Sequence, residues 1–342
     1  MYVSRNNITI FSWFVILLGL AAFKGISVGV DYPMYYGFFL HKHYIGLLEP
    51  GVSVIYDIAV RYNSFYIFSI GVYFLFLFFI FYGIRKNSPN YLISIFFFVI
   101  MHIYYNGYNQ IRQLISVSIL FCFANYLISN KRMDKIKYIF VILLALLFHN
   151  SAIFLFTLLF IPKKKLKPIV VIPLFLISCV FYFIPSIKNQ IGEIMVFVSG
   201  FYGEKYGQGS YNFFGVNKEK GLLQFIPVFI QMVIVVISLY LSNPKVNLGI
   251  NDRLYQFSAN AVIVNLCLYS LAGIEAIDRL QIYFSCFNIY FYSYLVHLLL
   301  NDKQKLNGQI FVIIIIAFWI LYYILRLMIN VHGIVPYSFF FS

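Results

Sequence analysis

Residues 64–84 read SFYIFSIGVYFLFLFFIFYGI, and Arg85 and Lys86 follow them directly. The stretch contains no charged side chain, and as a helix it has the length needed to cross a hydrocarbon core about 30 Å thick. The rest of the chain has a similar character, since 62% of its 342 residues are hydrophobic and only 11% are charged. This composition predicts a protein that folds in a lipid bilayer.

Further apolar runs repeat along the chain. We expect spanning helices at about residues 6–24, 64–84, 91–106, 112–130, 168–187, 222–242, 255–273, 280–300 and 309–329. Two short helices between residues 138 and 162 bring the expected number of spans to about 11. The predicted fold class is therefore all-α, a polytopic integral membrane protein that forms a single transmembrane domain over residues 1–342.

Basic residues in the breaks between the runs predict the orientation. When the spans are threaded alternately, one side receives Arg5, Arg85, Lys86, Lys131, Arg132, Lys135, Lys137, Lys163, Lys164, Lys165, Lys167, Lys245, Arg253, Lys303 and Lys305. By the positive-inside rule this side is the cytoplasm, so we expect a cytoplasmic N-terminus and a periplasmic C-terminus. The net charge of +14 then reflects topology and anionic lipid headgroups rather than nucleic-acid binding.

Residues 138–162, YIFVILLALLFHNSAIFLFTLLFIP, interrupt this alternation, because basic clusters flank them at both ends. A single crossing would put one cluster on the wrong side. We therefore expect a re-entrant-like hairpin of two short helices that turns at His149, Asn150 and Ser151. Irregular backbone at membrane depth is tolerated only against protein or a wet cavity, so His149 is a candidate site residue.

Two outer segments, residues 25–63 and 188–221, are longer than turns require. The first carries Asp31 and Glu49, which are candidates for a general base or for ligands of sugar hydroxyls. The alternative is that each is a solvated loop carboxylate or a helix cap. His149 is a third candidate for the base, with the alternative that it only satisfies a backbone carbonyl.

Metal and disulfide chemistry is not expected. His41 and His43 lack further ligands at metal spacing. The four cysteines lie inside apolar runs without such spacing, and they are Cys122, Cys179, Cys267 and Cys286.

Arg112 and Arg279 are each expected at the outer start of a span and hence at the same membrane level. An arginine stays charged and is costly in apolar surroundings. Two such guanidinium groups would hold a pyrophosphate bidentately, and helix N-termini would add backbone donors. The alternative is that each arginine pairs with a neighbouring carboxylate or extends to the headgroups. Arg326, late in the last span, is left open between extending outward and lining the same cavity.

Six short motifs follow one another along the chain, and they are GVDYPMYYGFF (29–39), LLEPG (47–51), NQIRQLISVSIL (109–120), LLFHNSAIFLF (146–156), DRLQIYF (278–284) and VPYSFF (335–340). Their order resembles the EpsG-type branch of the Wzy polysaccharide polymerases. The resemblance implies that His149, Asp31 and Glu49 are catalytic candidates and that Arg112 and Arg279 bind pyrophosphate. It implies substrate contacts from Gln113 and Tyr337, and we expect further contacts from Tyr32, Tyr35 and Asp278.

The resemblance further implies a membrane glycosyltransferase of GT-C-like architecture. Such an enzyme would polymerise O-antigen, capsule or exopolysaccharide on the periplasmic, outer face of the bacterial cytoplasmic (inner) membrane. Its substrate would be an oligosaccharide repeat unit carried by undecaprenyl pyrophosphate, surrounded by membrane lipids, with no cofactor or metal. A chain-length regulator is kept as a candidate partner. The alternatives are an O-antigen ligase and a flippase or transporter of the same lipid-linked oligosaccharide.

Overall fold

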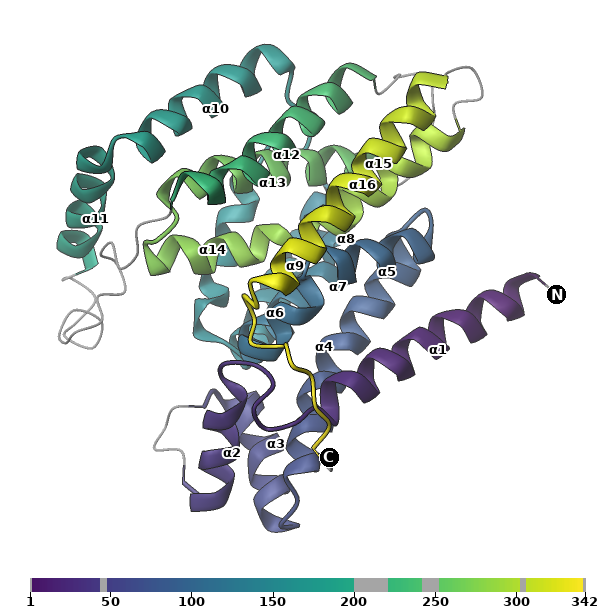
Figure 1. Cartoon of the computed structure of the whole chain (residues 1–342), viewed down its shortest axis with the longest axis vertical. Coiled ribbons are helices and arrows are strands. Elements are labelled where there is room, and N and C mark those ends of the chain that lie inside the picture. Colours follow the sequence, from purple (N-terminus) through teal and green to yellow (C-terminus); the bar gives the residue numbers. More distant parts are fainter. Residues whose placement is uncertain (1, 44–47, 200–220, 242–251, 302–305, 341–342) are drawn as a thin grey trace. The chain divides into compact units, whose positions relative to one another are not determined.

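The computed structural model describes all residues of the chain except 1, 44–47, 200–220, 242–251, 302–305 and 341–342 (Figure 1). Within the described residues the regular structure is helical, apart from an isolated antiparallel bridge between Lys24 and Phe339. The prediction of an all-α fold is confirmed for this part of the chain.

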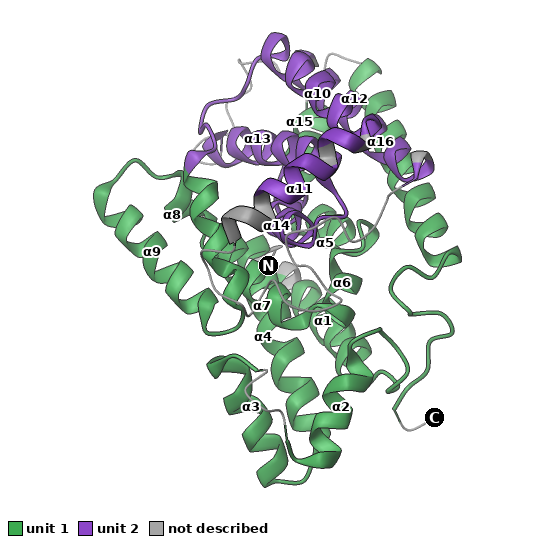
Figure 2. Cartoon of the chain, turned by 90° about the vertical axis from the view of Figure 1, so that its left-hand side faces the viewer, with its two compact units in different colours: residues 1–159, 292–342 green, residues 160–291 purple. Residues whose placement is uncertain are grey.

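The chain divides into two compact units, shown in green and purple in Figure 2. Unit 1 comprises residues 1–159 and 292–342, and unit 2 comprises residues 160–291. A single domain over residues 1–342 stays a prediction. The helices of unit 1 are α1 (Tyr2–Ala22), α2 (Tyr32–His41), α3 (Pro50–Arg61), α4 (Phe65–Asn87), α5 (Tyr91–Ile100), α6 (Ile103–Asn109), α7 (Ile111–Cys122), α8 (Ala124–Ile128), α9 (Arg132–Leu146) and α16 (Leu306–Met328).

Helix α4 coincides with the uncharged run at residues 64–84 and packs against α1, α3 and α7. Its fully buried side chains include Val72, Phe76, Leu77 and Ile80. Gly83 permits the close approach of α7, because a Cβ there would lie 2.8 Å from a ring atom of Phe121 and 3.0 Å from the Cα of Cys122. Small residues stabilise such contacts in lipid, where helices gain by close packing rather than by leaving water.

The run at residues 91–106 forms two helices instead of one. Helices α5 and α6 meet at a bend of 48°. His102 lies in this break with a φ of 62°, in the left-handed region that side chains other than glycine rarely adopt. The next run, residues 112–130, is likewise divided into α7 and α8 at Phe123.

The expected hairpin at residues 138–162 is present as two short arms. The first arm is α9, and the second is a 3-10 helix, η1 (Asn150–Phe160). The Tyr138 hydroxyl of the first arm donates to the Leu155 carbonyl of the second at 2.8 Å, so the arms lie side by side. Residues 147–149 connect them and hold His149 at the turn.

The outer segment at residues 25–63 is partly helical, whereas a loop was expected there. It contains α2 and α3, and each has a proline in its first turn, where the missing N–H costs nothing. The second expected loop, residues 188–221, begins inside α11 (Pro185–Ser199), and its remainder up to residue 220 lies outside the described residues.

Unit 2 contains α10 (Pro168–Phe183), α11, α12 (Leu222–Leu241), α13 (Asp252–Leu268), the 3-10 helix η5 (Tyr269–Leu271) and α14 (Glu275–Ser285), while α15 (Phe287–Asn301) continues into unit 1. Asn260 of α13 fastens the basic segment before α10. Its amide nitrogen donates to the carbonyls of Pro162 and Lys164, each at 2.7 Å, and its oxygen accepts the N–H of Leu166. A buried amide with both ends satisfied in this way favours one conformation of the segment.

Five helical stretches in the described residues are long and apolar enough to cross a membrane, or six if the bent α5–α6 pair is one span. They are Phe65–Asn87, Leu223–Tyr240, Asp252–Leu271, Glu275–Asn301 and Leu306–Met328. Several apolar helices are shorter than a full span. The chain therefore has the helices of a membrane protein, while the number of about 11 spans and the sides of the two termini stay predictions.

Replacement of Gly83 by alanine should weaken the contact between α4 and α7. We expect the melting temperature of the purified protein in detergent to fall by a few degrees, because the new Cβ meets backbone as well as a ring. Gly19→Ala in α1 is the matched control, since a Cβ there meets nothing within 4 Å and alanine favours the helix. Equal melting temperatures for the two variants would contradict this account of α4.

Candidate functional site

Residues 48–51, LEPG, bring the start of α3 against the hairpin turn. Glu49 precedes α3 with an extended backbone, and Pro50 begins the helix. The Gly51 N–H donates to the Leu147 carbonyl at 2.7 Å. A Cβ on Gly51 would lie 2.9 Å both from that carbonyl oxygen and from a ring atom of Phe148. Glycine is therefore required for the approach that carries Glu49 to the turn.

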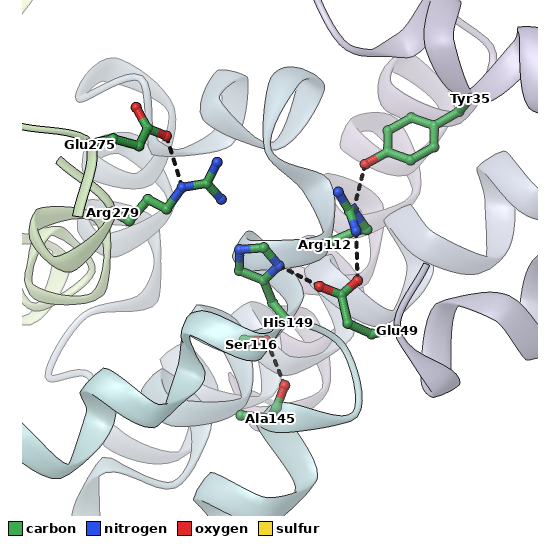
Figure 3. A network of polar contacts seen from close by, with 8 residues as sticks. All are labelled: Tyr35, Glu49, Arg112, Ser116, Ala145, His149, Glu275 and Arg279. Atoms are coloured by element: carbon green, nitrogen blue, oxygen red, sulfur yellow. Dashed lines mark hydrogen bonds and ion pairs between the residues drawn. The ribbon is translucent and has the colours of Figure 1, made fainter. Parts of the chain in front are cut away.

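Glu49 is buried and joins two basic side chains from distant parts of the sequence (Figure 3). Its Oε1 lies 2.9 Å from Nδ1 of His149, and its Oε2 accepts a hydrogen bond of 2.7 Å from Arg112. The Arg112 Nε donates to the Tyr35 hydroxyl at 2.9 Å. We call Tyr35, Glu49, Arg112 and His149 the Glu49 network. Four of the predicted site residues thus come together in unit 1.

Helix α7, which carries Arg112, is fastened to α9, which leads into the turn that holds His149. The Ser116 hydroxyl of α7 donates to the Ala145 carbonyl of α9 at 2.7 Å (Figure 3). Ser116 lies one helical turn after Arg112, and Ala145 lies four residues before His149. This hydrogen bond therefore fixes the arginine and the histidine relative to each other before Glu49 bridges them.

The electrostatics of Glu49 follow from these contacts. Burial raises the pKa of its carboxyl group, but the hydrogen bond from His149 and the charge of Arg112 outweigh burial and hold the pKa at about 2, below the ordinary 4.5. Glu49 is therefore ionised at neutral pH and is a weak base there. When neutral His149 donates its Nδ1–H to this carboxylate, the lone pair of the imidazole is on Nε2.

Arg279 lies in unit 2. Its Nε donates to Glu275 at 2.8 Å, one turn away on α14 (Figure 3). Pairing with a carboxylate, the alternative considered for both arginines, is thus observed for Arg279 and for Arg112. Because the two arginines belong to different units, the expected two-arginine clamp for pyrophosphate stays a prediction.

The other predicted site residues are not part of the Glu49 network. Asp31 precedes α2, is half-buried and makes no capping hydrogen bond through its side chain. The buried Tyr32 donates to Ser69, and Tyr337 donates to the Leu20 carbonyl. Gln113 is buried on α7, and in unit 2 the Asp278 carboxylate accepts the Gly273 N–H. Substrate contacts by these residues stay predictions.

Comparison with known proteins adds a decisive observation. The model of the EpsG family matches residues 7–339. The chain belongs to the EpsG family. No curated protein and no solved structure matches it. The match confirms the resemblance seen in the ordered motifs, and it indicates a role like that of the polysaccharide polymerases.

Three buried basic residues of this EpsG-family protein were not among the candidates from sequence. Lys24 is fully buried, with its side-chain nitrogen over the Tyr32 ring. His102 and His332 are also buried and stack on each other. A histidine directly after the apolar run IFFFVIM was the available signal for His102, because a polar side chain inside a span is costly.

The depressed pKa of Glu49 predicts a specific loss of stability in acid. Because the folded pKa lies below the ordinary value of 4.5, ionised Glu49 stabilises the fold above pH 4.5, and this contribution disappears as the pH falls toward 2. We expect wild-type protein in detergent to lose on the order of 2 kcal/mol across this range that Glu49→Gln does not lose. Melting curves at several pH values measure the difference.

The control for this titration is Asp57→Asn, which removes an exposed carboxylate from α3. It should leave the pH dependence of wild type intact. Parallel curves for wild type and Glu49→Gln would mean that Glu49 is not held ionised by its partners.

Proposed function

We propose that this protein polymerises lipid-linked oligosaccharide repeat units into bacterial surface polysaccharide such as O-antigen, capsule or exopolysaccharide. The growing chain would be carried by undecaprenyl pyrophosphate at the outer face of the cytoplasmic membrane. It would be transferred to a hydroxyl on the terminal sugar of a new lipid-linked repeat unit. The observation that carries this proposal is the Glu49 network, in which four motifs of an EpsG-family chain contribute to a single polar centre.

In the proposed reaction, the acceptor hydroxyl oxygen attacks the anomeric carbon of the donor sugar. The bond from that carbon to the pyrophosphate oxygen breaks, and undecaprenyl pyrophosphate leaves with the electron pair. The hydroxyl proton passes to Nε2 of His149. Glu49 is a positioning residue that orients the imidazole through Nδ1 and stabilises the imidazolium that forms. Asp31 stays an alternative base or a ligand of sugar hydroxyls.

Arg112 and Arg279 would stabilise the charge that develops on the leaving pyrophosphate. Preorganised donors of this kind are typically worth about 3 kcal/mol of barrier. Each arginine already pairs with a carboxylate. The pyrophosphate must therefore share the guanidinium group with Glu49 or Glu275, which makes its binding sensitive to the geometry of those pairs. Tyr35 supports this role for Arg112, because its hydroxyl accepts from Nε and orients the guanidinium plane.

Deletion of the gene and complementation in the source bacterium test the proposal. We expect wild type to restore a ladder of polymer on a glycan gel, and we expect His149→Gln, Arg112→Ala and Arg279→Ala to leave a single repeat unit on the acceptor. His41→Ala is the matched control, since His41 is exposed at the end of α2. Membrane levels of every variant are compared by immunoblot.

A full ladder from His149→Gln and Arg112→Ala at normal membrane levels would overturn the mechanism. Absence of even the single repeat unit in the deletion strain would indicate a ligase or a flippase instead of a polymerase.

Gly51→Ala tests the network as a unit without touching its polar side chains. The new Cβ would push α3 from the hairpin turn and separate Glu49 from His149, so we expect polymer length to fall strongly. Gly37→Ala in α2 is the control, because a Cβ there meets nothing within 4 Å. A normal ladder from Gly51→Ala would show that the contact between Glu49 and His149 is dispensable.

A further inference from the structure

A second group of basic side chains lies in unit 1, where the break before α6 meets the end of α16. The rings of His102 and His332 stack with their centroids 5.3 Å apart. An Arg326 amino group lies 2.9 Å from Nε2 of His332. The hydroxyls of Tyr105 and Tyr323 are hydrogen-bonded at 2.9 Å beside His102. We call these five residues the Arg326 cluster.

His102 holds a conformation that the sequence does not favour by itself. It interrupts a span at a bend of 48° and adopts a positive φ, which costs a residue other than glycine about 1 kcal/mol. The residue is 1% exposed, and its Nε2–H donates to the Tyr323 carbonyl at 3.2 Å, which leaves Nδ1 of the neutral ring as an acceptor that makes no hydrogen bond within the described residues. Backbone strain of this kind at a helix break is typical of functional sites.

The charge of the cluster is not neutralised within the part of the chain that the structure describes. Arg112 pairs with Glu49 and Arg279 pairs with Glu275, but Arg326 makes no ion pair, and its buried Nε has no hydrogen-bond partner. A half-buried arginine without a carboxylate is costly at the edge of a membrane, so an anion is the natural partner for it.

The side chains beside Arg326 also suit an anionic ligand. Nε2 of neutral His332 accepts from the Arg326 amino group and so orients the guanidinium group. In the hydrogen-bonded pair of Tyr105 and Tyr323, one hydroxyl keeps a proton that it can donate to a ligand. Burial and the charge of Arg326 lower the pKa of His332 to about 3, so this histidine stays neutral at pH 7. The cluster therefore combines a single fixed positive charge with a neutral hydroxyl donor, a set that suits a phosphate oxyanion.

The geometry points to a second anion site: we propose that the Arg326 cluster binds the diphosphate of the acceptor repeat unit. This inference rests on the proposed function, in which both substrates carry a lipid diphosphate but only the donor loses it. The donor's diphosphate must lie near the base in the Glu49 network. The acceptor's diphosphate must be held without reaction, and the Arg326 cluster has no carboxylate to repel it.

A structural connection joins the two sites within unit 1. Asn109 ends α6, and Arg112 is in the first turn of α7. The Asn109 side chain accepts the Val30 N–H at 2.7 Å, next to Asp31, and its amide nitrogen lies 3.5 Å from His332. The same short segments thus border both groups of basic residues, as a two-substrate site requires.

Native mass spectrometry of the purified full chain in neutral detergent tests the inference directly. The probe is farnesyl diphosphate, a short prenyl diphosphate. We expect wild type to bind two copies, and we expect Arg326→Gln to lose one copy, with at least about a tenfold weaker affinity at that site. Arg61→Gln, which removes an exposed positive charge from the end of α3, should keep both copies.

A measurement on wild type alone covers the case in which Arg326→Gln does not fold. Phenylglyoxal modifies accessible arginines, and peptide mass spectrometry follows Arg326. We expect farnesyl diphosphate to slow the modification of Arg326, and phosphatidylglycerol at the same concentration to leave it fast. Equal protection by phosphatidylglycerol would identify a site for bulk lipid headgroups and overturn the assignment to a diphosphate substrate.

Failure of this inference is distinguishable from failure of the proposed function. Two bound copies in folded Arg326→Gln, or modification of Arg326 that the probe does not slow, would overturn the second site while leaving the glycan ladder tests untouched. Conversely, a polymer ladder that persists in the deletion strain would overturn the polymerase function. Loss of one bound copy in Arg326→Gln would then still establish the anion site, but not its assignment to an acceptor.

Discussion

The burial of the Glu49 carboxylate is the constraint on which the centre of unit 1 depends. An ionised carboxylate removed from water is strongly destabilising unless partners compensate its charge. Glu49 obtains them from His149 on one oxygen and from Arg112 on the other. The helices that carry these partners must then be held in place, which the packing of α4 against α7 and the hydrogen bond from Ser116 to Ala145 accomplish.

The requirement for close approach explains several local features of this EpsG-family chain. Gly51 lets the start of α3 touch the hairpin turn, and Gly83 lets α7 touch α4. The hairpin itself supplies a histidine from backbone that is not α-helical, and at the membrane depth predicted for it such backbone must be covered by protein. The polar centre therefore depends on small residues and helix breaks as much as on the charged side chains themselves.

The three candidate arginines, Arg112, Arg279 and Arg326, fall into two electrostatic classes. Arg112 and Arg279 are paired with carboxylates, so a phosphate group there competes with an internal partner and can be released. Arg326 makes no ion pair in the described part of the chain, and neutral histidine and tyrosine side chains lie beside it. In the proposed reaction one lipid diphosphate is released and another is retained, and the two classes of arginine would serve these two roles.

The sequence by itself determined the class of the protein and its main spans. The uncharged run at residues 64–84 predicted α4, and the basic clusters around residues 138–162 predicted the hairpin. Both predictions were possible because the length of an apolar run and the charges beside it are local properties of the sequence, and they govern how a segment inserts into a bilayer. The ordered motifs also identified the family.

Only the tertiary structure decided which residues meet. Glu49 and His149 are 100 positions apart, and no local pattern encodes their contact. The helices α2 and α3 within the expected outer loop, the bend at His102 and the clustering of His102 with Arg326 likewise arise from packing between segments that are distant in the sequence.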